Sequence, residues 1–250
     1  MRLKISFLVM LFLFTLTAFP SEQVKKLSLS AKGISELDIN CGAGFLKVYG
    51  REGLKEIKVK AEIVVKGESA KKVLQKYVKL SLKKQGLSAV LISQIDWSGS
   101  SSLFKSAVIN LTVTVPKKMD LIVDDGSGSM EIKDITGDLK VNDGSGSMEI
   151  EDITGDLEVE DGSGSIKIEE IKGDVDIDDS SGNMDLRDIQ GDISIKDGSG
   201  TIYVRDVNGN VTVRDGSGSI SINGIEKNVT ILRSGSGSVN INNVKGKVNK

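Results

Sequence analysis

The stretch "DGSGSMEIKDITGDLKVN" occupies residues 125–142, and residues 143–160 read "DGSGSMEIEDITGDLEVE". The same pattern recurs every eighteen residues, with one single-residue insertion before the last copy. The copies begin at Asp125, Asp143, Asp161, Asp179, Asp197, Asp215 and Ser234. A fixed period of this length is typical of stacked structural repeats. Residues 124–250 are therefore predicted to form seven coils of a solenoid.

Five positions of each copy predict the shape of the coil. In the first copy these positions are Met130, Ile132, Ile135, Leu139 and Val141. Across the seven copies 34 of the 35 equivalent positions are apolar, Lys250 being the exception. Apolar and polar residues alternate within each pair of positions, which indicates two short strands per coil. We therefore expect an all-β, two-sided parallel β-solenoid with eighteen-residue coils, right-handed like other parallel crossovers.

The Gly-Ser-Gly phrase has a binding interpretation and a structural one. A phosphate loop needs a following helix and a lysine beside the glycine, and neither is present here. A calcium-binding nonapeptide roll needs an aspartate where this chain has Met130. A chain-reversing corner needs glycine for positive φ and an aspartate that accepts backbone N–H groups. We therefore interpret the phrase as a corner.

The N-terminus is predicted to be a processing segment. Arg2 and Lys4 precede an apolar run over residues 5–19, as in a secretory signal peptide over residues 1–21. Because a membrane-spanning helix needs ~20 apolar residues, this run is short for a span, although an uncleaved anchor is an alternative. We expect an exported protein, periplasmic, cell-surface or extracellular.

Between the signal and the repeats the pattern is less regular. Residues 22–33 are interpreted as a polar lead-in, and residues 34–123 as an irregular β region continuous with the coils as one domain. Its expected strands are residues 34–40, 45–50, 57–65, 89–93 and 108–115, with one short helix over 69–78. Cys41 is the only cysteine, so no intrachain disulfide can form, and it is expected to be buried in a strand.

Composition excludes several function classes. The net charge of −2 provides no basic footprint for nucleic acid. The chain contains no histidine, which rules out Ser-His-Asp catalysis and removes the commonest metal ligand. A carbohydrate-active enzyme could use paired carboxylates, but coils this short leave no long loops to wall a cleft. We therefore predict a non-catalytic protein without a cofactor.

The outward-facing carboxylates form the candidate site. Stacking should place two groups of three carboxylates against each other: Asp156, Glu158 and Glu160 in one coil, and Asp174, Asp176 and Asp178 in the next. Like charges in register destabilise a sheet, so these six residues either bind a divalent cation or are tolerated through solvation and nearby lysines. The column of corner residues that begins with Asp125 raises the same question.

The chain also resembles a known family. The segments "VTVPKKMDLIVDDGSGSMEIKDITGDLKV" (113–141) and "LDINCGAGFLKVYG" (37–50) resemble the coils and the opening rung of the DUF4097 family, adhesin-like β-strand repeat proteins of bacterial and archaeal envelopes. The resemblance covers residues 34–250 and implies an exported β-solenoid with no catalytic residues to transfer. The copies of this chain are unusually uniform for the family.

These observations give three functional hypotheses. The first is a structural or adhesive module of the cell envelope, the second a cation- or glycan-binding module that uses the acidic face, and the third a carbohydrate-active enzyme. The expected partners are a cell-surface glycan or an envelope protein, with membrane contact only through an uncleaved N-terminal segment. End-to-end self-association of the coils is a further expectation.

Overall fold

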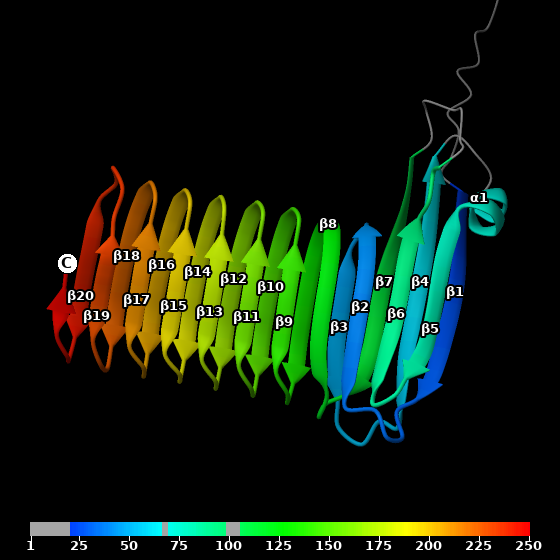
Figure 1. Ribbon diagram of the computed structural model, residues 1–250, viewed down its shortest axis with the longest axis horizontal. Helices are drawn as coiled ribbons and strands as arrows, with labels where there is room; N and C mark the ends of the chain where they lie inside the picture. The colour runs from blue at the N-terminus through cyan, green and yellow to red at the C-terminus, as the bar shows by residue number, and fades with distance from the viewer. Residues whose placement is uncertain (1–20, 67–69, 99–105) are drawn as a thin grey trace, which may run out of the picture.

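The computed structural model describes residues 21–66, 70–98 and 106–250, so the predicted signal lies almost entirely outside the described residues. The chain forms a rod in which coils stack side by side along the long axis (Figure 1). Two parallel sheets make the two sides of the rod, as the repeat pattern predicts. The all-β parallel solenoid is thus confirmed.

Strands form all of the regular secondary structure of the described residues except one short helix. The N-terminal elements are β1 (Ser21–Ser30), β2 (Glu36–Ala43), β3 (Leu46–Arg51), β4 (Glu56–Lys66), α1 (Ala70–Lys76), β5 (Val78–Gln85), β6 (Ser88–Ile95) and β7 (Ser106–Pro116). The coils comprise β8 (Asp120–Ile135), β9 (Leu139–Asp143), β10 (Gly146–Ile153), β11 (Leu157–Asp161), β12 (Gly164–Ile171), β13 (Val175–Asp179), β14 (Gly182–Ile189), β15 (Ile193–Asp197), β16 (Gly200–Val207), β17 (Val211–Asp215), β18 (Gly218–Ile225), β19 (Val229–Arg233), β20 (Val239–Val244) and β21 (Val248–Asn249).

Each coil contributes one strand to each sheet. We call the sheet that contains β10, β12 and the later even-numbered strands sheet A, and the sheet that contains β9, β11 and the later odd-numbered strands sheet B. β8 turns the corner and belongs to both sheets. The parallel register joins residues eighteen positions apart, as when Met148 pairs with Met130 on one side and Ile166 on the other.

The predicted inward positions form the core. Met130, Ile132, Ile135, Leu139 and Val141 of the first copy are all buried, and their equivalents continue the same columns. Burial of such a side chain contributes roughly 1.5–3 kcal/mol. The columns therefore stabilise the rod without a disulfide.

Two irregularities interrupt the repeat. The tenth residue of each copy lies in the left-handed region and is skipped in the sheet A register, so Glu151 pairs with Glu169 and Ile153 with Ile171. The single insertion is Leu232, which the sheet B register skips and which is 56% exposed. Leu232 is a bulge that absorbs an extra residue without disturbing the inward columns. The tenth residue is present in every coil, so it bends each strand without changing the register.

The N-terminal region caps one end of the rod. The coil formed by β2 and β3 lies between the β6–β7 level and β8, although it precedes both β6 and β7 in sequence (Figure 1). Beyond β6 and β7 the pairing becomes antiparallel, with β5 on β6, β4 on β7 and β1 on β4. These antiparallel strands end the stack.

The structure corrects two details of the sequence interpretation. Residues 22–33, expected as a polar lead-in, contain strand β1, which pairs with β4 along its whole length. The helix expected over residues 69–78 is described over Ala70–Lys76, and Val78 begins β5, which was not predicted. Both missed strands lie at sheet edges, and their apolar residues, such as Leu27 in β1 and Leu80 in β5, are only partly buried against the core.

The fourth residue of the corner requires glycine. Gly128, Gly146 and Gly164 have φ values of +139°, +146° and +150°, a region that L side chains rarely adopt. A Cβ on Gly164 would lie 1.6 Å from the carbonyl oxygen of Gly146 in the preceding coil. The Gly-Ser-Gly phrase is therefore a corner, and its last glycine permits the close approach of adjacent coils.

We expect Gly164→Ala to lower the free energy of unfolding by about 3 kcal/mol or more, because the new methyl group meets both an unfavourable φ and the backbone of the preceding coil. The matched control is Gly162→Ser, since the fourth copy carries Ser180 at that position. This control should cost about 1 kcal/mol. Urea unfolding followed by circular dichroism measures both, and a greater loss in the control would contradict this role of Gly164.

Candidate functional site

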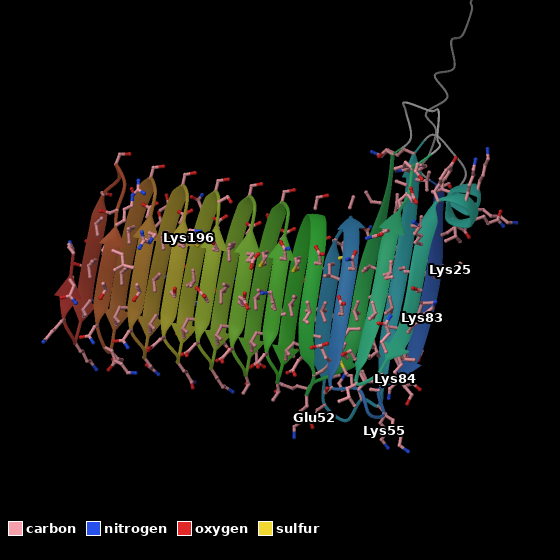
Figure 2. All side chains as sticks on the ribbon, in the orientation of Figure 1. Lys25, Glu52, Lys55, Lys83, Lys84 and Lys196 are labelled. Atoms are coloured by element: carbon pink, nitrogen blue, oxygen red, sulfur yellow. The ribbon has the colours of Figure 1, made fainter. Side chains whose placement is uncertain are left out.

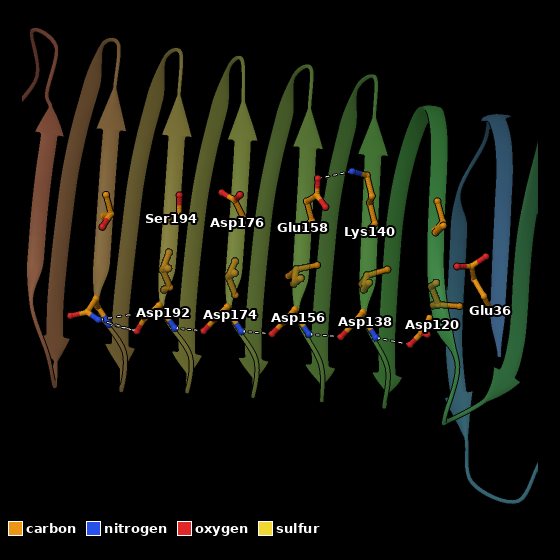
Figure 3. A pocket seen from close by; sticks show the side chains of 18 residues that line it. Glu36, Asp120, Asp138, Lys140, Asp156, Glu158, Asp174, Asp176, Asp192 and Ser194 are labelled. Carbon is orange, nitrogen blue, oxygen red and sulfur yellow. Dashed lines mark hydrogen bonds and ion pairs between the residues drawn. The ribbon is translucent and has the colours of Figure 1, made fainter.

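An open groove runs along the outward face of sheet B. It has a volume of about 660 Å³ and extends from Glu36 on β2 to Thr212 on β17. Two rows of side chains line it (Figure 3). The first, the ladder row, comprises Asp120, Asp138, Asp156, Asp174, Asp192 and Asn210, and the second, the strand row, comprises Ile122, Lys140, Glu158, Asp176, Ser194 and Thr212. The site therefore crosses successive coils and lies parallel to the rod axis.

The ladder row holds consecutive coils together. Oδ1 of Asp156 accepts a hydrogen bond from the backbone N–H of Asp174 at 2.9 Å, and Asp174 accepts in turn from the N–H of Asp192 at 2.7 Å. The same contact recurs from Asp120 to Lys247, with Asn210 and Asn228 serving as acceptors in the later coils. These aspartates are therefore structural acceptors as well as part of the groove wall.

The six residues of the sequence hypothesis divide between two roles. Asp156 and Asp174 belong to the ladder row, whereas Glu158 pairs with Asp176 in register and Glu160 pairs with Asp178. The in-register stacking of like charges is thus as expected. Lysines from the flanking coils reduce the repulsion, with Lys140 lying 2.6 Å from Glu158 and Lys196 lying 2.6 Å from Asp178.

Unlike Glu158 and Asp178, Asp176 in the centre of the groove has no lysine within the described ranges that reduces the repulsion. It forms no ion pair with any residue in the described part of the chain. Among residues 21–66, 70–98 and 106–250, no three acidic or cysteine side chains converge in a way that could hold a metal ion. Divalent-cation binding by this face stays a prediction.

The outward face of sheet A has a different electrostatic character. There Lys133 contacts Glu149 at 3.3 Å and Glu151 at 2.8 Å, and Arg187 contacts Glu169 at 2.9 Å. Similar contacts join Lys47 to Glu131, Lys167 to Glu149 and Arg205 to Asp185. Charges on sheet A thus pair with one another, which leaves sheet B as the face with uncompensated carboxylates.

We expect Asp174→Ala to lower the free energy of unfolding by about 1–3 kcal/mol, because the N–H of Asp192 loses a charged acceptor. Asp174→Asn should cost less, since Asn210 and Asn228 fill the same role in later coils. Thermal unfolding with and without millimolar calcium checks both variants. A calcium-dependent stabilisation of the parent protein that Asp174→Asn abolishes would instead assign this residue to a cation site.

A second column of carboxyl groups lies inside the rod. The corner aspartates Asp125, Asp143, Asp161, Asp179, Asp197 and Asp215 are only 0–4% exposed. In four coils one oxygen accepts the backbone N–H of the serine two residues later, as in Asp143 with Ser145 at 3.2 Å. This is the expected Asx-type turn. These aspartates are therefore buried and do not belong to the outer acidic face with which the sequence pattern groups them.

The second carboxyl oxygen of each corner aspartate is buried without a hydrogen-bond partner among the described residues. Because burial disfavours the charged form, the pKa of Asp143, Asp179 and Asp197 rises to about 6, and the neighbouring aspartates of the column add to each shift. Burial also raises the pKa of Asp125, Asp161 and Asp215. Burial in this column therefore favours the protonated, neutral form of the corner aspartates.

The column continues into the N-terminal region. Cys41 pairs in register with Asp125, and its Sγ donates to the Asp125 carboxylate at 3.3 Å. Cys41 is half-buried, and burial raises the pKa of its thiol. Ser93, the next residue in register, is buried. Polar side chains therefore follow this corner from the cap to the sixth coil.

The corner column makes stability depend on pH. Because the folded pKa of about 6 exceeds the ordinary aspartate value, the folded state binds more protons than the unfolded state between about pH 4 and 6. The stabilisation by these groups is complete below about pH 4 and is lost as the pH rises through 6.

We expect the triple variant Asp143→Asn, Asp179→Asn and Asp197→Asn to unfold at higher urea concentration than the parent protein at neutral pH, and to depend less on pH between about 4 and 7. Asparagine keeps the acceptor for the serine N–H and cannot ionise. Urea titrations at a series of pH values measure the difference. A variant with the same pH dependence as the parent would show that the column is not the titrating group.

No helix among the described residues is long and apolar enough to cross a membrane. A family model described as Toastrack DUF4097 matches residues 34–208, well over half of the chain. The chain belongs to the Toastrack DUF4097 family. The matched region of this Toastrack protein covers the cap from β2 onward and the first coils, including most of the groove. No curated protein matches the chain by sequence.

Solved structures resemble the Toastrack chain over nearly its whole length. The crystal structure of a "putative lipid binding protein" from Parabacteroides distasonis is 15% identical, with a TM-score of 0.55 and coverage of 92% of this chain and 97% of that one. A "putative adhesin" from the same species is 14% identical, with a TM-score of 0.44 and coverage of 92% and 96%. The first comparison shows a shared fold.

Proposed function

We propose that the protein is an exported, non-catalytic adhesion module of the cell envelope that binds a linear, hydroxyl-rich glycan along the groove of sheet B. The observation that carries this proposal is the continuity of the groove across successive coils, with a polar side chain at nearly every level of both rows. A repeating polymer laid along the rod would meet an Asp or Asn of the ladder row at each level, beside a strand-row side chain that differs from coil to coil. Carboxylates suit this ligand because they accept hydrogen bonds from hydroxyl groups.

Export is supported by the sequence of the N-terminus. Arg2 and Lys4 followed by the apolar run of residues 5–19 have the organisation of a secretory signal. A location at the cell envelope agrees with the adhesin-like character of the DUF4097 family that the sequence resembles.

The groove favours a glycan over two other ligand classes. An acyl chain, the apolar part of a lipid, would need an apolar channel, whereas both rows of this groove carry carboxylates. A glycan-cleaving enzyme would need one carboxyl that is held protonated to act as the acid. The carboxyl groups whose pKa rises to about 6 lie in the buried corner column, away from the open groove. Burial also raises the pKa of Asp38 on β2, but this residue is not part of the groove lining. Binding without cleavage is therefore the proposed activity.

A panel of immobilised polysaccharides tests the proposal. The double variant Glu158→Ser and Asp176→Ser introduces the residue that the next coil carries at Ser194, and should weaken binding by at least about tenfold. The matched control is Asp185→Ser on sheet A, where the sixth coil carries Ser221 at the equivalent position, and it should bind like the parent.

Three outcomes would contradict the proposal. The parent protein could bind no polysaccharide, the groove variant could bind as tightly as the parent, or the sheet A control could lose as much affinity as the groove variant. An assay for released reducing ends separates binding from hydrolysis. Release that the groove variant abolishes would assign the protein to the enzymes instead.

A further inference from the structure

The net charge of the chain conceals a separation of charge along the rod. Residues 21–119 contain 18 lysines and arginines against 8 acidic residues, a net charge of +10. Residues 120–250 contain 13 basic residues against 27 acidic ones, a net charge of −14. Because the first group builds the cap and its adjoining coil and the second builds the repeats, the molecule has a basic end and an acidic body.

Exposed lysines gather at the cap. Lys25 lies on edge strand β1, Lys83 and Lys84 lie on edge strand β5, and Lys55 precedes β4, all at the same end of the rod (Figure 2). Lysines on edge strands discourage pairing with another sheet, which gives part of the explanation. This role does not cover Lys55, which lies outside the strands.

Among the described residues, most cap lysines lack the ion pairs with carboxylates that lysines of the coils form. Lys25, Lys26, Lys55 and Lys83 form no ion pair or side-chain hydrogen bond with any residue in the described ranges. In the coils, by contrast, Lys133, Lys140 and Lys196 each contact a carboxylate of an adjacent coil. Several positive charges at the cap are therefore available to an external anion.

The arrangement suits an extended anionic surface better than a small ligand. The free lysines come from two edge strands and a turn, and are spread over the end of the rod (Figure 2). The chain enters this end at Ser21 of β1, directly after the apolar run of residues 5–19. Where this run is retained as an uncleaved anchor, the bilayer that holds it lies close to the cap. A lysine near an anionic membrane contributes about 1 kcal/mol of attraction.

We propose that the cap docks on anionic lipid headgroups at a membrane surface and orients the rod. Headgroups attract the basic cap and repel the acidic coils, so both forces turn the rod upright with the coils directed away from the membrane. The groove of sheet B then points along the membrane normal. This docking needs no ligand in the groove, so it stands or falls separately from glycan binding.

Sedimentation of the full chain with lipid vesicles tests the docking. The probes are vesicles of phosphatidylcholine alone and vesicles that also contain phosphatidylglycerol. The apolar N-terminal segment contributes to binding on both, so the ratio of the two affinities isolates the electrostatic part. We expect a clear preference for the anionic vesicles that disappears at about 0.5 M salt, where charges are screened within a few ångströms.

Two charge-matched variants locate the effect. Replacing four cap lysines with glutamine, Lys25, Lys26, Lys55 and Lys83, should reduce the affinity ratio by about tenfold or more. Replacing Lys172, Lys196, Lys245 and Lys247 of the coils with glutamine changes the net charge equally and should leave the ratio nearly unchanged. Melting curves establish that both variants are folded.

Three results would overturn the docking proposal. The parent protein could show no preference for anionic vesicles, or both lysine variants could lose the preference equally. The third result would be that the protein binds soluble polyphosphate but binds neutral and anionic vesicles equally. The cap would then be a site for a soluble polyanion.

Discussion

The register between coils is the constraint on which the rest of the structure depends. Backbone pairing joins residues eighteen positions apart, so each side chain lies beside its own equivalent in the neighbouring coils. Each side chain must therefore be able to pack beside the equivalent side chains of the coils above and below it. Apolar columns pack readily, and the corner glycines allow backbones to approach closely. Carboxyl groups are the difficult case, and this chain accommodates them with backbone N–H donors in the ladder row, with lysines between glutamates, and with burial that favours the neutral acid.

The two faces show how much chemistry one backbone permits. On sheet A, Lys133 forms ion pairs with Glu131, Glu149 and Glu151, so the charges of this face neutralise one another. Sheet B has the same strand spacing, but no lysine or arginine of the described residues pairs with Asp176, and a groove lies between the ladder row and the strand row. Outward positions are free of packing demands, so they are where a binding function can be installed without cost to the core.

Sequence reasoning predicted the coils because the apolar positions repeat with a strict period, and it predicted the corner because only glycine suits the backbone at Gly164. It missed β1 and β5, in which a short apolar alternation, such as Leu27 with Leu29 or Leu80 with Leu82, stands among exposed lysines. It grouped Asp143 with the outer face, although alternation from the inward Val141 points to the interior. It found Asp156 and Asp174 as groove residues but not as amide acceptors. An Asp or Asn at the same position of the first six copies was the available signal.

The position of the β2–β3 coil has a consequence for how the molecule assembles. This coil pairs with β6 and β7 on one side and β8 on the other, so the cap requires contacts between segments far apart in sequence. Once β8 is in place, each later coil needs only the one before it. Forming such a contact closes a short loop, which is entropically cheap and fast. The slow step of folding therefore lies at the cap, and the remaining coils can add one by one in the order in which the chain is made.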